Sequence, residues 1–240
     1  MLADLVARFS GTPRPALVVD LGNGTGLSTR YWADKAERVI GVEPTADMRA
    51  QAVATTTASS VTYRAGFSHQ TGLAAGSARV VCCMQALHWM EPAATFAEAA
   101  RILEPGGVFV ACDYDWPPAS GSWEADAAFE TCIRLGRKLE QERGLTSRLQ
   151  HWDKDGHLAR MQASGSFRHV RDLAVHHVDS CNASRFVGLV LSQGYIVSLR
   201  RAGFGEDELG VTALRAVAQR VWGETSRPCL WIARVRVGVV

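Results

Sequence analysis

The sequence predicts an α/β fold in which helices cover a mostly parallel sheet. A short apolar run at 17–19 ends in Asp20 and meets glycines at alternate positions, as a buried strand does when it enters a tight turn. A second apolar run, at 39–42, ends in Glu43. Strand-like and helix-like segments then alternate along most of the chain, which is typical of strands joined by helical crossovers.

The first part of the chain supplies the elements of this sheet in order. A helical turn at 2–9 is apolar on one face, and two prolines separate it from the first strand. Good helix formers then alternate with apolar or β-branched runs. We expect helices at 26–36, at 45–55 and from Pro92 to Leu103, and strands at 61–64, from Val80 and at 107–113.

Residues 115–165 interrupt the alternation. Two prolines and a glycine break the chain at 117–121, and strong helix formers follow at 124–143 and again at 153–163. We expect a helical cap insertion within a single domain of residues 1–240. It would cover the carboxyl ends of the strands, where open α/β sheets bind their ligands.

The chain returns to a strand pattern after this insertion. An alternating run at 167–180 predicts a sixth strand, and two helical segments follow at 182–201 and 205–222. A last apolar run at 228–239 predicts a seventh strand. The ending is therefore strand, helices, strand.

Composition excludes several classes of function. A hydrophobic content of 47% supports a large core, and a net charge of +2 gives no electrostatic basis for binding nucleic acid. No apolar stretch approaches the roughly 20 residues of a membrane span, and the first residues do not resemble a secretion signal. The six cysteines lack zinc-ligand spacing. We expect a cytoplasmic protein with reduced thiols, no bound metal and no membrane contact.

The turn after the first strand carries the main functional signal. Its glycines are Gly22, Gly24 and Gly26. A dinucleotide-binding turn would place its third glycine at position 27, which is Leu27. The pattern Asp-x-Gly-x-Gly-x-Gly with a distal Glu43 instead resembles the S-adenosylmethionine site of class I methyltransferases. The resemblance implies that Asp20 and the glycines form the cofactor turn and that Glu43 binds the ribose hydroxyls.

Three further segments resemble the same family in order. The segment 39–44 with Met48 resembles the ribose strand, 80–89 resembles the fourth strand and its loop, and 103–110 resembles the turn into the fifth strand. The run Gln-Ala-Leu-His-Trp is similar to the branch that includes ubiquinone-biosynthesis and trans-aconitate methyltransferases. The family implies a Rossmann-like sheet of seven strands with the seventh antiparallel. It adds to the expected cofactor contacts Pro44, Met48, Met84 and Ala86.

Two positions depart from the family pattern. Asn23 stands where relatives have Cys, Ser or Thr, and Phe67 stands where many have an Asp that accepts from adenine. Asn tolerates turn geometry, while Ser68 could accept from adenine or Phe67 could stack on it. Both departures leave open the alternative that the chain is a non-catalytic partner or regulatory subunit with this fold. An NAD(P)-dependent oxidoreductase is the other alternative, and Leu27 argues against it.

Methyl transfer is an in-line displacement that mainly requires the protein to align the acceptor. A base is needed only for a hydroxyl, an acidic carbon or a protonated amine. His88, which follows the fourth strand, is the leading candidate base, and the alternative is that it orders the loop. Asp115, just past the fifth strand, is the second candidate. Asp113 and Asp115 lack a third metal ligand in sequence, so no metal site is expected.

Aromatic and polar residues near the expected cleft are candidates for the acceptor site, each with core packing or a solvated turn as the alternative. They are Trp89, Tyr114, Trp116, His151, Trp152 and Tyr195. Their aromatic bias fits a small hydrophobic or aromatic metabolite, methylated on oxygen, nitrogen or carbon. An RNA or protein acceptor would need an open or basic groove. We expect a monomer or homodimer.

Overall fold

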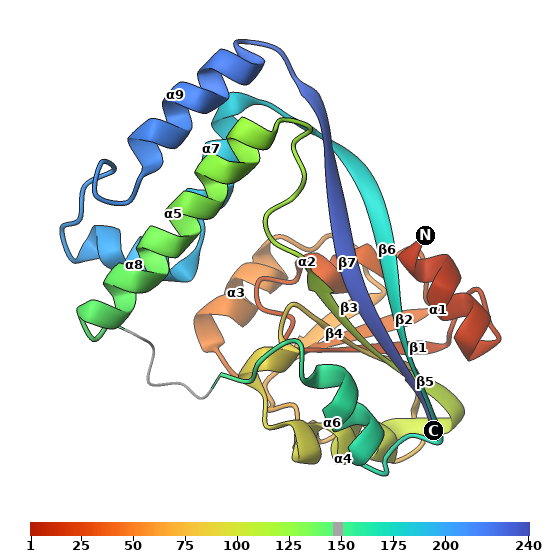
Figure 1. The fold of residues 1–240 in the computed structure, drawn as a ribbon. Helices are drawn as coiled ribbons and strands as arrows, with labels where there is room; N and C mark the ends of the chain where they lie inside the picture. The colour runs from red at the N-terminus through yellow and green to blue at the C-terminus, as the bar shows by residue number, and fades with distance from the viewer. Residues whose placement is uncertain (146–150) are drawn as a thin grey trace. The chain divides into compact units, whose positions relative to one another are not determined.

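The computed structural model describes residues 1–145 and 151–240, and the chain divides into two compact units (Figure 1). The sheet unit consists of Met1–Tyr114, Leu149–Val175 and Ala233–Val240. The helical unit consists of Asp115–Arg148 and His176–Ile232.

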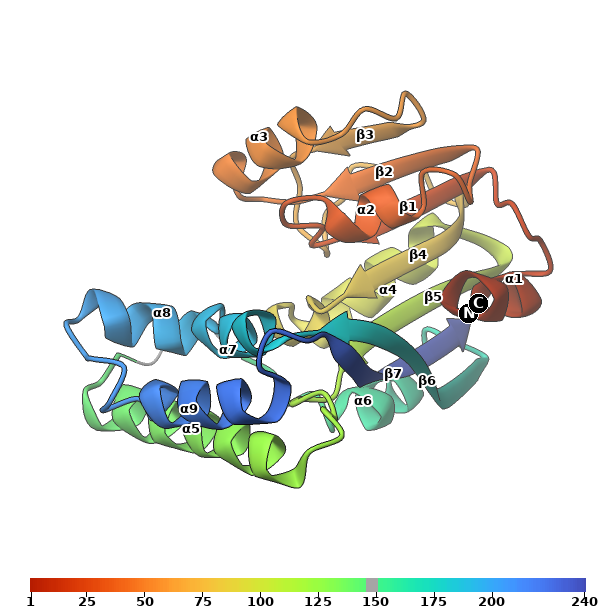
Figure 2. The ribbon, with the colours of Figure 1, turned by 90° about the horizontal axis from the view of Figure 1, so that it is seen from above.

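Seven strands form a sheet in the order β3-β2-β1-β4-β5-β7-β6. The strands are β1 (Leu17–Leu21), β2 (Arg38–Val42), β3 (Val61–Arg64), β4 (Ala78–Met84), β5 (Leu103–Tyr114), β6 (His169–Cys181) and β7 (Arg227–Val239). Neighbours from β3 to β5 pair in parallel, and β7 pairs antiparallel with β5. Figure 2 shows β3, β2, β1, β4 and β5 side by side in that order. The predicted α/β fold with an antiparallel seventh strand is confirmed.

Side-chain alternation along the strands creates two cores in the sheet unit. Leu17, Val19 and Leu21 of β1 join residues of α4 (Pro92–Ile102) and α6 (His157–Ala163), and we call this the α4 core. Val18 faces the other way and packs with α1 (Leu2–Ser10), and we call this the α1 core. Strands buried on both faces explain why the sequence shows continuous apolar runs.

The remaining helices of the sheet unit are α2 (Leu27–Tyr31), α3 (Ala46–Ala54) and the one-turn helix η1 (Leu87–Trp89). The structure shortens the predicted helix 26–36. After α2 the chain tightens into turns, because the amides of Trp32 and Ala33 bond to carbonyls three residues back. These turns bury Trp32 and Ala36 in the α1 core before β2 begins.

The helical unit contains α5 (Trp123–Glu142), α7 (Ala183–Leu191), α8 (Gly194–Arg201) and α9 (Val211–Trp222) around one core. The predicted helix 182–201 is therefore two helices, separated by an extended Gln193. The predicted helix 205–222 begins only at Val211. Gly210 has a φ of 73°, which an α-helix cannot contain.

Residues of the predicted insertion 115–165 occur in both units. Residues 115–145 group with 176–232 in the helical unit, whereas 151–175 group with the sheet unit. The helix expected at 153–163 begins at His157 and contacts α4. The placement of a cap over the strand ends stays a prediction.

Two further expectations concern the whole chain. All six cysteines are buried and none forms a disulfide. Among the described residues, no helix combines the length and the apolar character that crossing a membrane requires.

Candidate cofactor and active site

The glycine turn after β1 has one open position. Gly22, Gly24 and Gly26 all have positive φ, the conformation that favours glycine. A Cβ on Gly22 would lie 2.9 Å from the Cβ of Ala86, and one on Gly26 would lie 3.0 Å from the Cβ of Ala52. A Cβ on Gly24 would meet only the Met48 sulfur, at 4.0 Å. Gly24 is therefore the glycine of this turn that a ligand can approach.

Asp20 lies behind this turn. Its carboxylate is fully buried and accepts hydrogen bonds from the hydroxyls of Ser28 at 2.6 Å and Thr29 at 2.7 Å. Burial raises the pKa of Asp20 to about 6, because these neutral donors only partly offset the loss of water. The carboxylate thus fastens the start of α2 to the end of β1, although the sequence predicts that it is a cofactor contact.

Glu43 occupies the position predicted for the ribose ligand. It directly follows β2, is 6% exposed, and accepts from the amide of Gly24 at 3.1 Å and from that of Thr45 at 2.9 Å. Each carboxylate oxygen uses one bond here and can accept another. Asn23 donates to the carbonyl of Gly24 at 2.9 Å, while its own Oδ1 is buried without a hydrogen bond. The turn therefore keeps unused acceptors beside its open glycine.

The side expected to hold adenine is more exposed. Pro44, Met48 and Phe67 are all exposed, and the Phe67 ring stacks on His69 at a centroid distance of 5.5 Å. Ser68 is buried, and its hydroxyl bonds to that of Thr95 at 2.8 Å. An open hollow of about 400 Å³ is lined by Pro44 and residues from 64–72. Phe67 stacks on His69 but is 56% exposed, which leaves part of its ring open for stacking on a ligand, whereas the Ser68 hydroxyl is buried with Thr95.

The end of β4 leads into the proposed catalytic loop. Met84 is half-buried, Ala86 is buried against the turn at Gly22, and Gln85 has a φ of 54°, which non-glycine residues rarely adopt. His88 follows in η1 and is buried. The strained Gln85 and the tight packing of Ala86 fix the path by which the chain presents His88.

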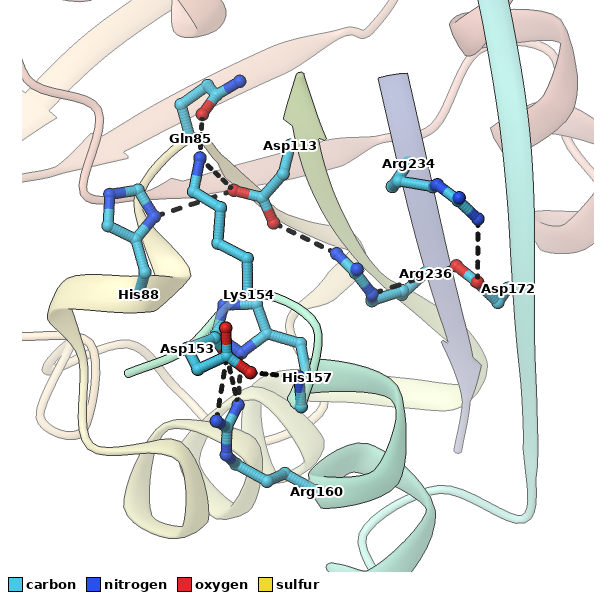
Figure 3. Close-up of polar contacts among 11 residues, drawn as sticks. Gln85, His88, Asp113, Asp153, Lys154, His157, Arg160, Asp172, Arg234 and Arg236 are labelled. Atoms are coloured by element: carbon cyan, nitrogen blue, oxygen red, sulfur yellow. Dashed lines mark hydrogen bonds and ion pairs between the residues drawn. The ribbon is translucent and has the colours of Figure 1, made fainter. Parts of the chain in front are cut away.

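A buried charge cluster surrounds His88, and sequence reasoning did not assemble it. Figure 3 shows the side chains of His88, Lys154 and Arg236 converging on Asp113. Asp113 is 3% exposed, and its Oδ1 lies 3.6 Å from His88 Nδ1 and 3.3 Å from Lys154 Nζ. Arg236 donates to Oδ2 at 3.1 Å. Lys154 also donates to Gln85 Oε1 at 2.7 Å.

The alternation of the sheet explains why these groups meet. Ala111 of β5 packs in the α4 core, and Asp113 follows it on the same face. Val235 and Val237 of β7 pack in the α1 core, so Arg236 between them faces the same side as Asp113. Asp113 and Arg236 are charged residues at positions of two predicted strands where the alternation places core residues. This mismatch is the sequence signal that could have revealed the cluster.

Electrostatics in the cluster favour an ionised Asp113. Burial alone would raise its pKa, but His88 and Lys154 outweigh burial, and the pKa lies below its ordinary value. His157, at the start of α6, is fully buried, and burial lowers its pKa to about 4. Its Nδ1 lies 2.9 Å from Arg160 Nη1. His157 is therefore neutral near pH 7.

Three of the predicted acceptor residues lie around His88. The ring of His151 lies 5.0 Å from that of His88 and 5.0 Å from that of Trp89. The amide of Trp152 donates to the carbonyl of His88 at 2.8 Å, and Arg160 lies 5.6 Å from the Trp152 ring. Trp89 is 51% exposed. The exposed indole of Trp89 therefore lies next to the ring of His88.

Comparisons with known proteins identify the family of the chain. A family model described as a methyltransferase domain matches residues 19–111. A protein of Synechocystis named as an uncharacterized methyltransferase is 30% identical over 160 residues, which cover 61% of this chain and 74% of that protein. The chain belongs to the class I S-adenosylmethionine-dependent methyltransferases.

Other similar proteins bear the same family name. A Dictyostelium discoideum protein named as a methyltransferase is 27% identical over 114 residues, and the match covers 48% of this chain and 42% of that relative's length. A solved structure from Anaeromyxobacter dehalogenans, described as a type II methyltransferase, has a TM-score of 0.73 at 22% identity. That alignment covers 99% of this chain and 94% of the other and shows the shared fold.

The remaining predicted site residues of this methyltransferase lie at or beyond the end of β5. Tyr114 ends β5 in the sheet unit, while Asp115 is exposed in the helical unit. Trp116, also in the helical unit, packs against Phe129 at a ring-centroid distance of 6.3 Å. Tyr195 is buried in the helical core, with the Arg137 guanidinium 4.2 Å from its ring. Packing within the helical unit accounts for Trp116 and Tyr195, and their substrate role stays a prediction.

No group of three or more metal-ligating side chains occurs within residues 1–145 and 151–240. Asp113 is instead held by cationic side chains.

Proposed function

We propose that this methyltransferase binds S-adenosylmethionine at the turn of residues 22–26 and transfers its methyl group to a small hydrophobic or aromatic acceptor. The observation that carries the proposal is the buried carboxylate of Glu43, which bonds to the amide of the open glycine, Gly24. When bound, this cofactor supplies an already activated methyl group. The protein then has to bind and orient the acceptor and to exclude water from the site.

The residues at this turn fit the cofactor. Glu43 keeps acceptor capacity for two ribose hydroxyls, because each of its oxygens takes one amide hydrogen bond. Gly24 lets a ligand approach the backbone without meeting a side chain. Phe67, which is 56% exposed, offers an aromatic face to a purine.

Calorimetry with S-adenosylhomocysteine and with NADH tests the cofactor assignment. We expect the first to bind and the second not to bind. Glu43→Ala should weaken binding of S-adenosylhomocysteine by roughly 1–3 kcal/mol, because a charged hydrogen-bond partner is lost. Binding of NADH alone would contradict the assignment. No binding of either compound, together with an obligate protein partner, would favour a regulatory subunit.

Gly24→Ala gives a sharper test of where the cofactor lies. Its matched control is Gly76→Ala, because Gly24 has a φ of 53°, Gly76 has a φ of 61°, and neither Cβ would meet an atom closer than 4.0 Å. Both variants should lose about 1–2 kcal/mol of stability from left-handed strain. Only Gly24→Ala should lose affinity for S-adenosylhomocysteine. Equal affinities in the two variants would place the ligand elsewhere.

The acceptor class rests on Trp89, whose exposed ring lies 5.1 Å from that of His88. An exposed indole binds flat or apolar molecules well. In methyl-transfer assays over a panel of small aromatic and aliphatic acceptors, Trp89→Ala should raise KM for the accepted compound. Trp123→Ala, which removes an indole that is 80% exposed in α5, should leave KM unchanged. Activity on RNA or protein alone would contradict a small-molecule acceptor.

The same preparation gives the oligomeric state. We expect a monomer or a homodimer by light scattering, and a larger assembly would contradict this expectation.

A further inference from the structure

We propose that Asp113 and His88 form a carboxylate–imidazole dyad, in which Asp113 holds the Nδ1 proton of His88 and leaves Nε2 to receive a proton from the acceptor. This inference rests on the proposed methyl transfer, since a proton acceptor has a use only if the acceptor loses a proton. Asp113 is then a positioning residue, and His88 is the catalytic base.

The first support is the way two buried atoms face each other. Asp113 Oδ1 and His88 Nδ1 lie 3.6 Å apart, and among the described residues neither has a hydrogen-bond partner, although Lys154 Nζ forms an ion pair with the same Oδ1 at 3.3 Å. An ionised carboxylate can only accept hydrogen bonds, so the nitrogen that faces it is best satisfied when it carries the proton. A small closing movement would turn this contact into a hydrogen bond, and it would fix the tautomer of His88.

The second support is the set of charges that keeps Asp113 ionised. Lys154 and Arg236 lie within 3.3 Å of its two oxygens, from a loop before α6 and from β7. Lys154 is held in place by Gln85, so its ammonium group stays beside the carboxylate. His157 is neutral near pH 7, and therefore does not compete with His88 as a positively charged partner of Asp113. This cationic support keeps Asp113 an ionised acceptor for a hydrogen on His88 Nδ1.

The third support is the direction in which the ring of His88 points. In Figure 3 the second ring nitrogen, Nε2, points away from Asp113. The described residues place no hydrogen bond on Nε2. The side chain is 9% exposed while Nδ1 is buried, so this exposure belongs to the rest of the ring. The rings of Trp89 and His151 flank it at 5.1 and 5.0 Å.

The proton balance of the step is simple for a hydroxyl acceptor. The oxygen forms a bond to the methyl carbon, the carbon–sulfur bond breaks with its electron pair returning to sulfur, and Nε2 takes the hydroxyl proton. The products are the methyl ether, S-adenosylhomocysteine and an imidazolium, which Asp113 stabilises until it releases its proton to water. No other reactant is needed.

The purely structural alternative is that Asp113 serves only to neutralise Lys154 and Arg236. The two roles differ in what they predict for His88. A dyad requires the neutral ring to carry its proton on Nδ1, and it requires that preference to depend on Asp113. A structural counter-ion sets no tautomer.

Nitrogen-15 NMR of the histidine side chains distinguishes the two roles without any acceptor. The protein is observed at about pH 8, above the usual range of histidine pKa values, and the His88 signals are assigned by their loss in His88→Gln. We expect wild type to carry the proton on Nδ1. Asp113→Asn should shift His88 toward the Nε2-protonated tautomer. Asp172→Asn, which removes a carboxylate 3.8 Å from Arg236, should leave the tautomer unchanged.

An Nε2-protonated His88 in wild type would overturn the dyad, whether or not Asp113→Asn folds. The same holds if Asp113→Asn folds and keeps the wild-type tautomer. Titration of the same samples with S-adenosylhomocysteine keeps the two proposals apart, because loss of that binding contradicts the cofactor site and leaves the tautomer result standing. With a hydroxyl acceptor, Asp113→Asn should lower kcat by roughly 10²- to 10⁴-fold with little change in KM.

Discussion

Two buried aspartates of the same sheet are stabilised in opposite ways. Asp20 of β1 is 0% exposed and receives hydrogen bonds from two hydroxyls and a thiol. Asp113 of β5 is 3% exposed and lies among a lysine, an arginine and a histidine. The pKa of Asp20 is raised to about 6, whereas that of Asp113 is lowered.

The difference shows that hydrogen bonding alone does not keep a buried carboxylate strongly acidic. Neutral donors satisfy the geometry of Asp20, but burial still disfavours its charge. Asp113 is buried to a comparable degree, but its cationic partners lower its pKa by more than burial raises it. Asp20 is therefore suited to fastening a turn, and Asp113 to holding other charges in place.

Removal of Asp113 should have the largest effect. Asp113→Ala removes the carboxylate that faces both Lys154 and the buried Arg236, leaving Arg236 only Asp172 at 3.8 Å, and it should lower the free energy of unfolding by about 3–5 kcal/mol. Urea denaturation at pH 7 measures the loss. Asp20→Asn, which keeps the shape and leaves no cation unpaired, should cost less. Equal losses in the two variants would remove the distinction between the two sites.

Substitutions in the turn should show that the Asp20 region depends on backbone geometry. Gly26→Ala adds left-handed strain and places a Cβ against the hydroxyl of Tyr63 and the Cβ of Ala52. We expect a loss of about 2–4 kcal/mol in the free energy of unfolding. Gly76→Ala, with φ of 61° in open space, should lose only the strain component, about 1–2 kcal/mol. If Gly26→Ala is no worse than this control, the turn is loosely packed.

The pH dependence of stability should separate Asp20 from the Asp113 cluster. Between its ordinary pKa of 3.8 and its folded value of about 6, Asp20 binds more protons in the folded state, so it stabilises the fold as the pH falls. His157, with a folded pKa of about 4 against 6.5, binds more protons when unfolded, so it destabilises the fold as the pH falls.

The two effects oppose each other between about pH 6 and pH 4, each by about 2–3 kcal/mol. His157→Gln should therefore gain stability relative to wild type as the pH is lowered from 7 to about 4. Asp20→Asn should lose stability relative to wild type over the same range. Denaturation midpoints at several pH values would show these trends, and parallel curves for all three proteins would refute them.

Asp172→Asn should have the smallest effect. Asp172 lies 3.8 Å from both Arg234 and Arg236 and is 28% exposed, so water and the long distance weaken its interactions. We expect a loss below about 1 kcal/mol in the free energy of unfolding. A loss as large as that of Asp113→Ala would mean that Arg236 depends on both carboxylates equally.

The glycine turn could be predicted from sequence because its determinants are local. Gly24 and Glu43 are 19 residues apart and join neighbouring parallel strands, so the ends of two apolar runs locate both. The charge cluster could not be assembled in this way. Asp113 and Arg236 are 123 residues apart, and Lys154 is 69 residues from Gln85. Periodicity places each on a face of an element but does not reveal which faces meet.

Local rules also failed at two helix boundaries. The apolar pattern of 182–201 continues through the break at Gln193, because both helices bury the same kind of face in the helical core. The pattern of 205–222 gave no weight to Gly210, although a left-handed glycine stops a helix from extending backwards. In both places the backbone conformation of one residue mattered more than hydrophobic periodicity.

The path of the chain between the two units limits how this protein can be divided. The chain passes from one unit to the other after residue 114, between residues 145 and 151, and after residues 175 and 232, so segments of the sheet unit lie before, between and after the two segments of the helical unit. No single cleavage can therefore release the helical unit as a separate fragment, and no simple truncation can remove it while leaving the sheet unit whole. Because each unit is built from more than one segment of the chain, neither can be inserted, deleted or exchanged as one continuous segment.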